Sequence, residues 1–182
     1  MRPLLKLALV VGLQVLLLLS LIGFKQYTVW TGETVLLKVQ PVDPRDLLRG
    51  DYITVRYDIS TIDLDDVAGD DYVGGTAYVE LREDADGYWR AVAVHDDRER
   101  SFDGTVLIEA HVSRWNLNHH TGSERIELDY GIEEVFIPEG SGNQLSFGDG
   151  HVVAVEAKVD RWGNAVPRRF YVDGEPFDLK RR

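Results

Sequence analysis

The chain divides by its hydrophobic pattern into one unbroken apolar stretch near the N-terminus and a long region of alternating residues. From Leu7 to Phe24 nearly every residue is Leu, Val, Ile, Ala or Gly, and only Gln14 and Ser20 interrupt the run. A helix of about 20 residues crosses a bilayer core of about 30 Å. Residues 7–24 therefore predict one membrane crossing, with the lipid bilayer as their partner.

Beyond Thr28 the dominant period becomes two, which is typical of half-buried strands. Inward-facing positions are expected at Val35, Leu37 and Val39, at Val79 and Leu81, at Val106, Ile108, Ala110 and Val112, and at Val153, Val155, Ala157 and Val159. A further strand is expected at 170–172, and residues 64–68 are compatible with a short helical turn. The pattern predicts a mainly β fold, a compact antiparallel domain that is barrel- or sandwich-like, and it leaves the choice between these two open.

Asp-Gly pairs separate these alternating segments. They occur at 86–87, 103–104, 149–150 and 173–174, and such pairs accept the positive φ angles of tight hairpin turns. The strands are therefore expected to pair as antiparallel hairpins.

The residues that flank the apolar run predict its orientation. Arg2 and Lys6 precede it and Lys25 follows, so the excess of positive charge favours a cytoplasmic N-terminus. A cleaved signal peptide is the alternative, but the run exceeds the usual hydrophobic region of about 7–15 residues and no Ala-x-Ala site follows it. We expect a single-pass protein of the cell membrane, with an anchor in residues 1–26 and an extracytoplasmic domain in residues 27–182.

Composition narrows the classes of partner. The net charge is −11, so nucleic acid and anionic lipid head groups are poor partners. The chain has no cysteine, which excludes disulfides and thiolate metal sites. The roughly 155 residues after the anchor suit one domain of ordinary size.

One short segment identifies a family. Gly50-Asp51-Tyr52-Ile53-Thr54-Val55-Arg56-Tyr57 predicts a turn that leads into a strand, with Ile53, Val55 and Tyr57 in the core. It resembles the signature of the GDYXXLXY family, with Val55 in the place of the family's Leu. A second block, Tyr130-Gly131-Ile132-Glu133 followed by Pro138-Glu139-Gly140, is similar to another motif of that family, and the likeness extends over nearly the whole domain. The resemblance implies a membrane-anchored protein of uncharacterised molecular function that acts with a multi-spanning membrane protein.

The charged approach to the Gly-Asp turn is the first candidate for a binding surface. Two prolines and several charged residues lie between Pro41 and Arg49, where they predict a stiff, exposed connector that presents its charges to a partner. The candidate binding residues are Asp43, Arg45, Arg49, Asp51, Tyr52, Arg56, Tyr130 and Glu133. A purely structural connector explains much of the same pattern.

Catalytic alternatives are weaker. The Gly-Asp turn after an anchor also resembles signal-peptidase-like barrels, but no serine lies between Gly23 and Gly50, and no lysine lies between Lys38 and Lys158. An envelope hydrolase that pairs Asp51 with Glu133 is the alternative function, and it requires the two carboxylates to converge in a pocket. His119 and His120 have no third ligand at a recognisable spacing, so we expect no metal and no cofactor.

Overall fold

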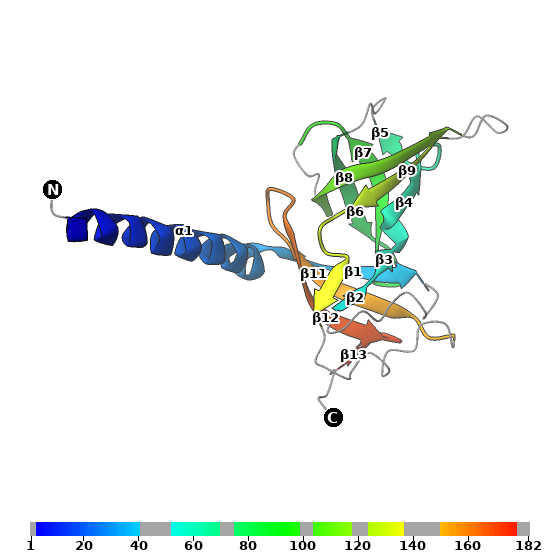
Figure 1. Ribbon diagram of the computed structural model, residues 1–182. Helices are drawn as coiled ribbons and strands as arrows, with labels where there is room; N and C mark the ends of the chain where they lie inside the picture. The colour runs from blue at the N-terminus through cyan, green and yellow to red at the C-terminus, as the bar shows by residue number, and fades with distance from the viewer. Residues whose placement is uncertain are drawn as a thin grey trace.

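The computed structural model describes residues 3–40, 52–69, 75–98, 104–117, 124–136 and 150–177 (Figure 1). The helix α1 spans Pro3–Thr31, and a 3₁₀ turn, η1, spans Asp58–Ser60. The strands are β1 (Glu33–Gln40), β2 (Tyr52–Thr54), β3 (Arg56–Tyr57), β4 (Thr61–Asp63), β5 (Ala68–Gly69), β6 (Thr76–Glu83), β7 (Trp89–His95), β8 (Thr105–Leu117), β9 (Glu124–Asp129), β10 (Glu134–Phe136), β11 (Val153–Val159), β12 (Ala165–Val172) and β13 (Glu175–Phe177).

The apolar run forms one straight helix that projects away from the β domain (Figure 1). α1 is long and apolar enough to cross a bilayer, with a mean hydropathy of 2.6 over its most apolar window. No described part of the β domain covers that window. The helix runs seven residues beyond Phe24, so its last turns reach the domain.

The strands form two large sheets and one short pair. One large sheet has the order β13-β12-β11-β1-β3 and the other β4-β9-β8-β6-β7-β5, while β10 pairs with β2. All pairs are antiparallel except β5 with β7, and one of the large sheets curls into half a barrel. The prediction of a mainly β, antiparallel domain behind an apolar helix is confirmed.

The core lies between the large sheets, and the alternating positions supply it. Five of the predicted core residues are completely buried: Val35 and Leu37 of β1, Val79 and Leu81 of β6, and Ile108 of β8. Val153, Val155, Ala157 and Val159 of β11 are likewise buried, as is Phe170 of β12. The period-two interpretation thus placed the inward faces of these strands correctly. It predicted no strand at β4, β5, β7, β9, β10 or β13.

The Gly-Asp-Tyr segment differs from its prediction. One continuous strand is predicted through Tyr57, but the backbone leaves the ladder at Val55 and the two halves join different sheets. β2 pairs with β10, whereas β3 pairs with the end of β1 through Val39 and Tyr57. Val55 and Tyr57 are completely buried, as expected, and the side chain of Ile53 lies outside the described residues.

Two local predictions have different outcomes. Asp173 and Gly174 both have positive φ, at 51° and 83°, and form the tight turn between β12 and β13 as expected of an Asp-Gly pair. The helical turn considered for residues 64–68 is wrong: a simple turn follows Asp63 and β5 begins at Ala68.

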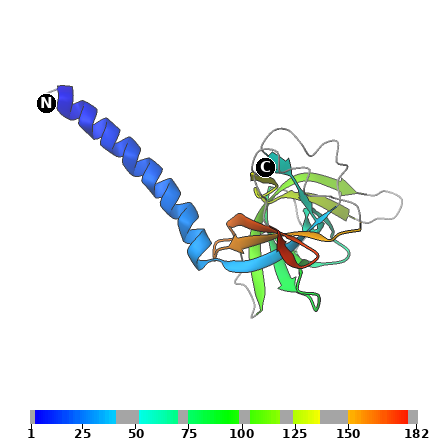
Figure 2. The same ribbon diagram turned by 90° about the horizontal axis from the view of Figure 1, so that it is seen from below.

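The end of α1 is packed against the tip of the β11–β12 hairpin, and Figures 1 and 2 show the two side by side. We call this contact, made by Thr28, Gly32, Asp160 and Trp162, the helix junction. The Thr28 hydroxyl donates to Asp160 Oδ2 at 2.6 Å, and both residues are buried. The Trp162 ring lies 5.3 Å from the ring of Tyr27.

Gly32 completes the helix junction, because a Cβ there would lie 2.9 Å from the carbonyl oxygen of Val159. Lys158 binds the segment between α1 and β1, because its amino group donates to the Gly32 carbonyl at 3.2 Å and to the Thr34 hydroxyl at 2.7 Å. The helix therefore enters the domain through a fixed contact.

Candidate functional site

The two family-like motifs lie side by side, although about 75 residues separate them. In the register of β2 with β10, Thr54 pairs with Glu134 and Tyr52 with Phe136. Where the ladder ends, the Val55 amide donates to the Glu133 carbonyl at 2.8 Å. The short two-stranded sheet thus consists of one segment from each motif.

Two tyrosine hydroxyls lock the motifs together. Tyr57 donates to the carbonyl of Ile132 at 2.7 Å, and Tyr130 donates to the carbonyl of Ile59 at 2.6 Å. Each tyrosine belongs to one motif and binds the backbone at or beside the other, so the pair forms a reciprocal brace. We call these four residues the motif bridge.

Both phenols of the motif bridge are held in the neutral form. Burial, and secondly the negative charge of Glu133, raise the pKa of Tyr57 and that of Tyr130 well above the ordinary value for tyrosine. Tyr57 is 0% and Tyr130 7% exposed. A neutral phenol keeps its proton, and so both remain hydrogen-bond donors over the physiological pH range.

A tight turn orients Glu133 beside the motif bridge. Gly131 has a φ of 72°, a backbone conformation that residues other than glycine rarely adopt. Across this turn Glu133 Oε1 accepts a hydrogen bond from the Tyr130 amide. The carboxylate is half-buried and belongs to the wall of an open cleft.

That cleft is the candidate functional site. It has a volume of about 400 Å³ and is lined by residues of the two motifs and of β8 and β9. The residues lining it are Thr54, Val55, Arg56, Ser60, Ser113, Glu127, Leu128, Asp129, Gly131, Glu133 and Glu134. We call it the motif cleft.

Charge in the motif cleft is predominantly negative. Four carboxylates and one guanidinium, that of Arg56, line it. One of the four is already partnered, because Arg114 Nη1 lies 3.0 Å from Glu127 Oε1. Hydroxyls of Thr54, Ser60 and Ser113 add hydrogen-bonding groups. The cleft is suited to a polar ligand with cationic groups.

The structure brings some of the predicted site residues together. Arg56 is exposed and Glu133 half-buried, and both line the motif cleft. Tyr130 is buried behind it, where it offers little surface to a partner. The backbone of Tyr52 belongs to β2, but its side chain is outside the described residues. The remaining candidates, Asp43, Arg45, Arg49 and Asp51, also lie outside them.

Sequence reasoning missed several lining residues. Glu127 and Asp129 alternate with the buried Ile126 and Leu128 in β9. That alternation was the signal available, but it equally describes the solvated face of any edge of a sheet. Ser113 has no such signal, because it sits where the register of β8 with β9 shifts between Val112 and Arg114 and the next three residues are all exposed.

The described residues do not test the pairing of Asp51 with Glu133, and they form no metal site. Asp51 lies outside the described residues, so its pairing with Glu133 stays a prediction. In the described part of the chain no group of three or more His, Asp or Glu side chains is arranged to hold a metal ion. His119, His120 and Glu139 also fall outside it.

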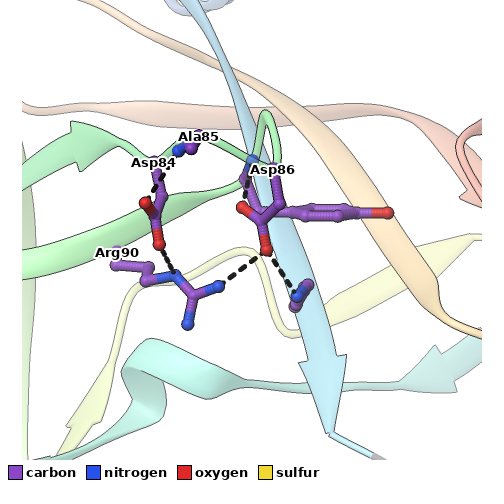
Figure 3. Close-up of polar contacts among 6 residues, drawn as sticks. Asp84, Ala85, Asp86 and Arg90 are labelled. Atoms are coloured by element: carbon purple, nitrogen blue, oxygen red, sulfur yellow. Dashed lines mark hydrogen bonds and ion pairs between the residues drawn. The ribbon is translucent and has the colours of Figure 1, made fainter.

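A second charged cluster lies at the β6–β7 hairpin (Figure 3). Asp86 Oδ2 accepts from Lys38 of β1 at 3.0 Å and from Arg90 at 2.7 Å, while Asp84 lies 2.8 Å from the Arg90 Nε. The hydrogen bond from Lys38 is the main reason why the pKa of Asp86 is lowered. This cluster ties a hairpin to the neighbouring sheet, and its charges are mutually satisfied.

One comparison with known proteins agrees with the resemblance to a family. The sequence profile of the GDYXXLXY protein family matches residues 14–170, from the middle of the apolar run to β12. No curated protein and no solved structure matches the chain.

Proposed function

This chain belongs to the GDYXXLXY family, and on that premise we propose that it is a single-pass membrane protein whose β domain is a binding module outside the cytoplasm. The observation that carries the proposal is the motif cleft. The two motifs that mark the family build one side of it, together with the brace behind it. We assign the domain no catalytic activity of its own.

The anchor rests on α1. Its apolar window is left uncovered by the domain, as a lipid-facing helix would be. The positive charges of Arg2 and Lys6, ahead of residues 7–24, favour a cytoplasmic N-terminus and so support a β domain on the other side of the membrane.

The partner that suits the cleft is a segment of a multi-spanning membrane protein, carrying Lys or Arg side chains. Asp129 and Glu134, two carboxylates that line the motif cleft, are exposed and have no charged partner among the residues that the structure describes. A cationic segment would pair with them, while Arg56 and the hydroxyls fix its register. Anchoring in the same membrane raises the effective concentration of such a partner.

Photocrosslinking in intact membranes tests the binding role. A photoreactive residue replaces Ser113, on the exposed rim of the cleft, and crosslinked proteins are identified with and without a second substitution, Glu134→Arg. The control is Glu175→Arg, which makes the same charge change at an exposed glutamate of β13 outside the cleft. We expect one reproducible membrane partner, at least tenfold less crosslinking with Glu134→Arg, and no change with Glu175→Arg. Equal crosslinking in the two variants would contradict the proposal.

The side of the membrane is tested separately. Because the chain has no cysteine, Glu175→Cys introduces a single thiol into the β domain. A membrane-impermeant maleimide should label it in intact cells. Labelling only after the cells are broken would place the domain in the cytoplasm.

A further inference from the structure

We propose that the tip of the β11–β12 hairpin, residues 160–164, lies in the lipid head-group layer beside α1, so that the membrane surface is a second partner of the β domain. The inference rests on the proposed membrane crossing of α1, and it is independent of what the motif cleft binds.

The depth of the tip follows from the helix. The run from Leu7 to Phe24 rises about 27 Å, close to the thickness of a bilayer core, and Lys25 comes next. Phe24 is therefore the last residue at hydrocarbon depth. The Trp162 ring stacks on it with ring centres 6.2 Å apart, so Trp162 is held at the boundary between hydrocarbon and head groups.

The side chains at this level have the chemistry of a membrane interface. Trp162 is joined by Tyr27, whose ring centre lies 5.3 Å from its own. Arg161 lies over the Trp162 ring, with its guanidinium carbon 4.3 Å from the ring centre. Tryptophan and tyrosine gather at head-group depth because their rings are apolar and their N–H or O–H groups are polar, and arginine reaches the phosphates from there.

The helix junction prevents the tip from swinging away. Asp160 is 3% exposed, and besides the Thr28 hydroxyl it accepts hydrogen bonds from the amides of Trp162 and Asn164, at 2.9 and 3.1 Å. The same carboxylate therefore shapes the turn and binds the helix. A crossing by α1 carries the hairpin tip to the membrane with it.

The occupant we assign is the interface of zwitterionic phospholipids. The chain carries a net charge of −11, which disfavours a close approach to an anionic surface. Phosphatidylcholine offers phosphates to Arg161 and Lys25 without that net repulsion. A surface of another protein over Trp162 is the competing occupant, and other proteins are absent from vesicles that contain this chain alone.

Depth-dependent quenching of tryptophan fluorescence tests the inference in the full chain. Three of the four tryptophans, Trp30, Trp89 and Trp115, are replaced by Phe so that Trp162 alone reports, and the protein is reconstituted into phosphatidylcholine vesicles with and without brominated chains. The matched control keeps only Trp115, which is 43% exposed in β8. We expect bromine near the head groups to quench Trp162 at least threefold more strongly than Trp115. Equal quenching of both residues would overturn the inference.

A third variant separates this inference from the proposed anchor. All four tryptophans are replaced by Phe and Leu16→Trp places the reporter in the middle of the apolar run. Strong quenching of that reporter by deep bromines, with Trp162 unquenched, would sink the interfacial tip and leave the anchor standing. An unquenched reporter at position 16 would remove both.

Discussion

The motif bridge and the helix junction are both held by buried hydroxyl groups, but they connect different things. In the motif bridge two neutral phenols each donate to a backbone carbonyl, and the contacts join two halves of the β domain. In the helix junction one threonine hydroxyl donates to a carboxylate, and the contact joins the domain to α1. Breaking the first removes support from the fold itself, whereas breaking the second frees the domain to change its pose relative to the helix. The predictions below separate these two consequences.

Tyr57→Ala should have the largest effect. It leaves a cavity where a fully buried ring was and strips the Ile132 carbonyl of its donor. The free energy of unfolding of the full chain in detergent should fall by about 3–5 kcal/mol. Tyr130→Phe keeps the ring and should cost only about 1–2 kcal/mol. Urea denaturation followed by circular dichroism measures both, and a loss below about 1 kcal/mol for Tyr57→Ala would show that the motif bridge does not support the fold.

Alkaline pH should destabilise the motif bridge as well. The pKa values of Tyr57 and Tyr130 are raised in the folded state, so their contribution is complete below the ordinary tyrosine pKa of about 10 and is lost as pH rises above it. In a titration followed by tyrosinate absorbance, exposed tyrosines should ionise first and these two only on unfolding. The double variant Tyr57→Phe and Tyr130→Phe should lose the late, cooperative phase. Persistence of that phase would contradict the assignment.

Gly163→Ala tests how tightly the hairpin tip is seated. Gly163 has a φ of 92°, and a Cβ there would lie 2.9 Å from the amide nitrogen of Glu109 in β8. Backbone strain and this clash together should cost about 2–4 kcal/mol. Gly174→Ala is the control, because its φ is 83° but nothing lies within 4 Å of the added methyl, so only about 1–2 kcal/mol should be lost. Equal losses in the same urea experiment would mean that the tip is loosely packed.

Thr28→Val should change the pose more than the stability. It removes the donor to Asp160 at nearly constant volume, at a cost of about 1–2 kcal/mol local to the helix junction. The anisotropy of Trp162 fluorescence, in the chain with that single tryptophan, should fall while the urea midpoint of the β domain barely moves. Thr28→Ser keeps the hydroxyl and should leave the anisotropy unchanged. A large drop in the urea midpoint would show that the junction is part of the fold.

Lys38→Met should have the smallest effect, because the Asp86 cluster is exposed and belongs to neither contact. The lowered pKa of Asp86 means that its contribution is present at neutral pH and is lost as pH falls through that pKa. Removing the Lys38 hydrogen bond should return the pKa of Asp86 toward its ordinary value and leave the stability almost unchanged, because the ion pair is exposed to solvent. A titration of the Asp86 carboxyl by NMR checks the shift. An unchanged pKa would assign the lowering to the Tyr88 amide and to Arg90.

Residue spacing and turn residues predicted the features of this fold that depend on neighbouring residues, but not the pairing of strands. The apolar run, the inward faces of β1, β6, β8 and β11, and the Asp173-Gly174 turn all follow from residue spacing and backbone preference. The split of the Gly-Asp-Tyr strand at Val55 does not. It depends on which partner each half finds, β10 for one and β1 for the other, and those partners are distant in the chain.

The candidate site could be predicted only in part, because it too depends on contacts between segments far apart in the chain. Arg56 and Glu133 were found because the resemblance drew attention to both motifs, but nothing in their spacing says that they share a cleft. Tyr130 was expected in a binding surface, and the structure buries it. Asp160 escaped notice because its partner Thr28 is 132 positions away.

That separation has a consequence for how the protein is made. Synthesis delivers α1 long before the hairpin that carries Asp160, and domains complete their folding only when their last strands arrive. On the proposed topology the helix is inserted in the bilayer before the residue that seats it exists. During most of its translation the nascent domain is therefore joined to the helix without the contact between Thr28 and Asp160. Its orientation relative to the helix becomes fixed in one of the last steps of folding. A chain that ends before β11 would still insert α1 in the membrane, but its β domain would have no fixed orientation relative to the helix.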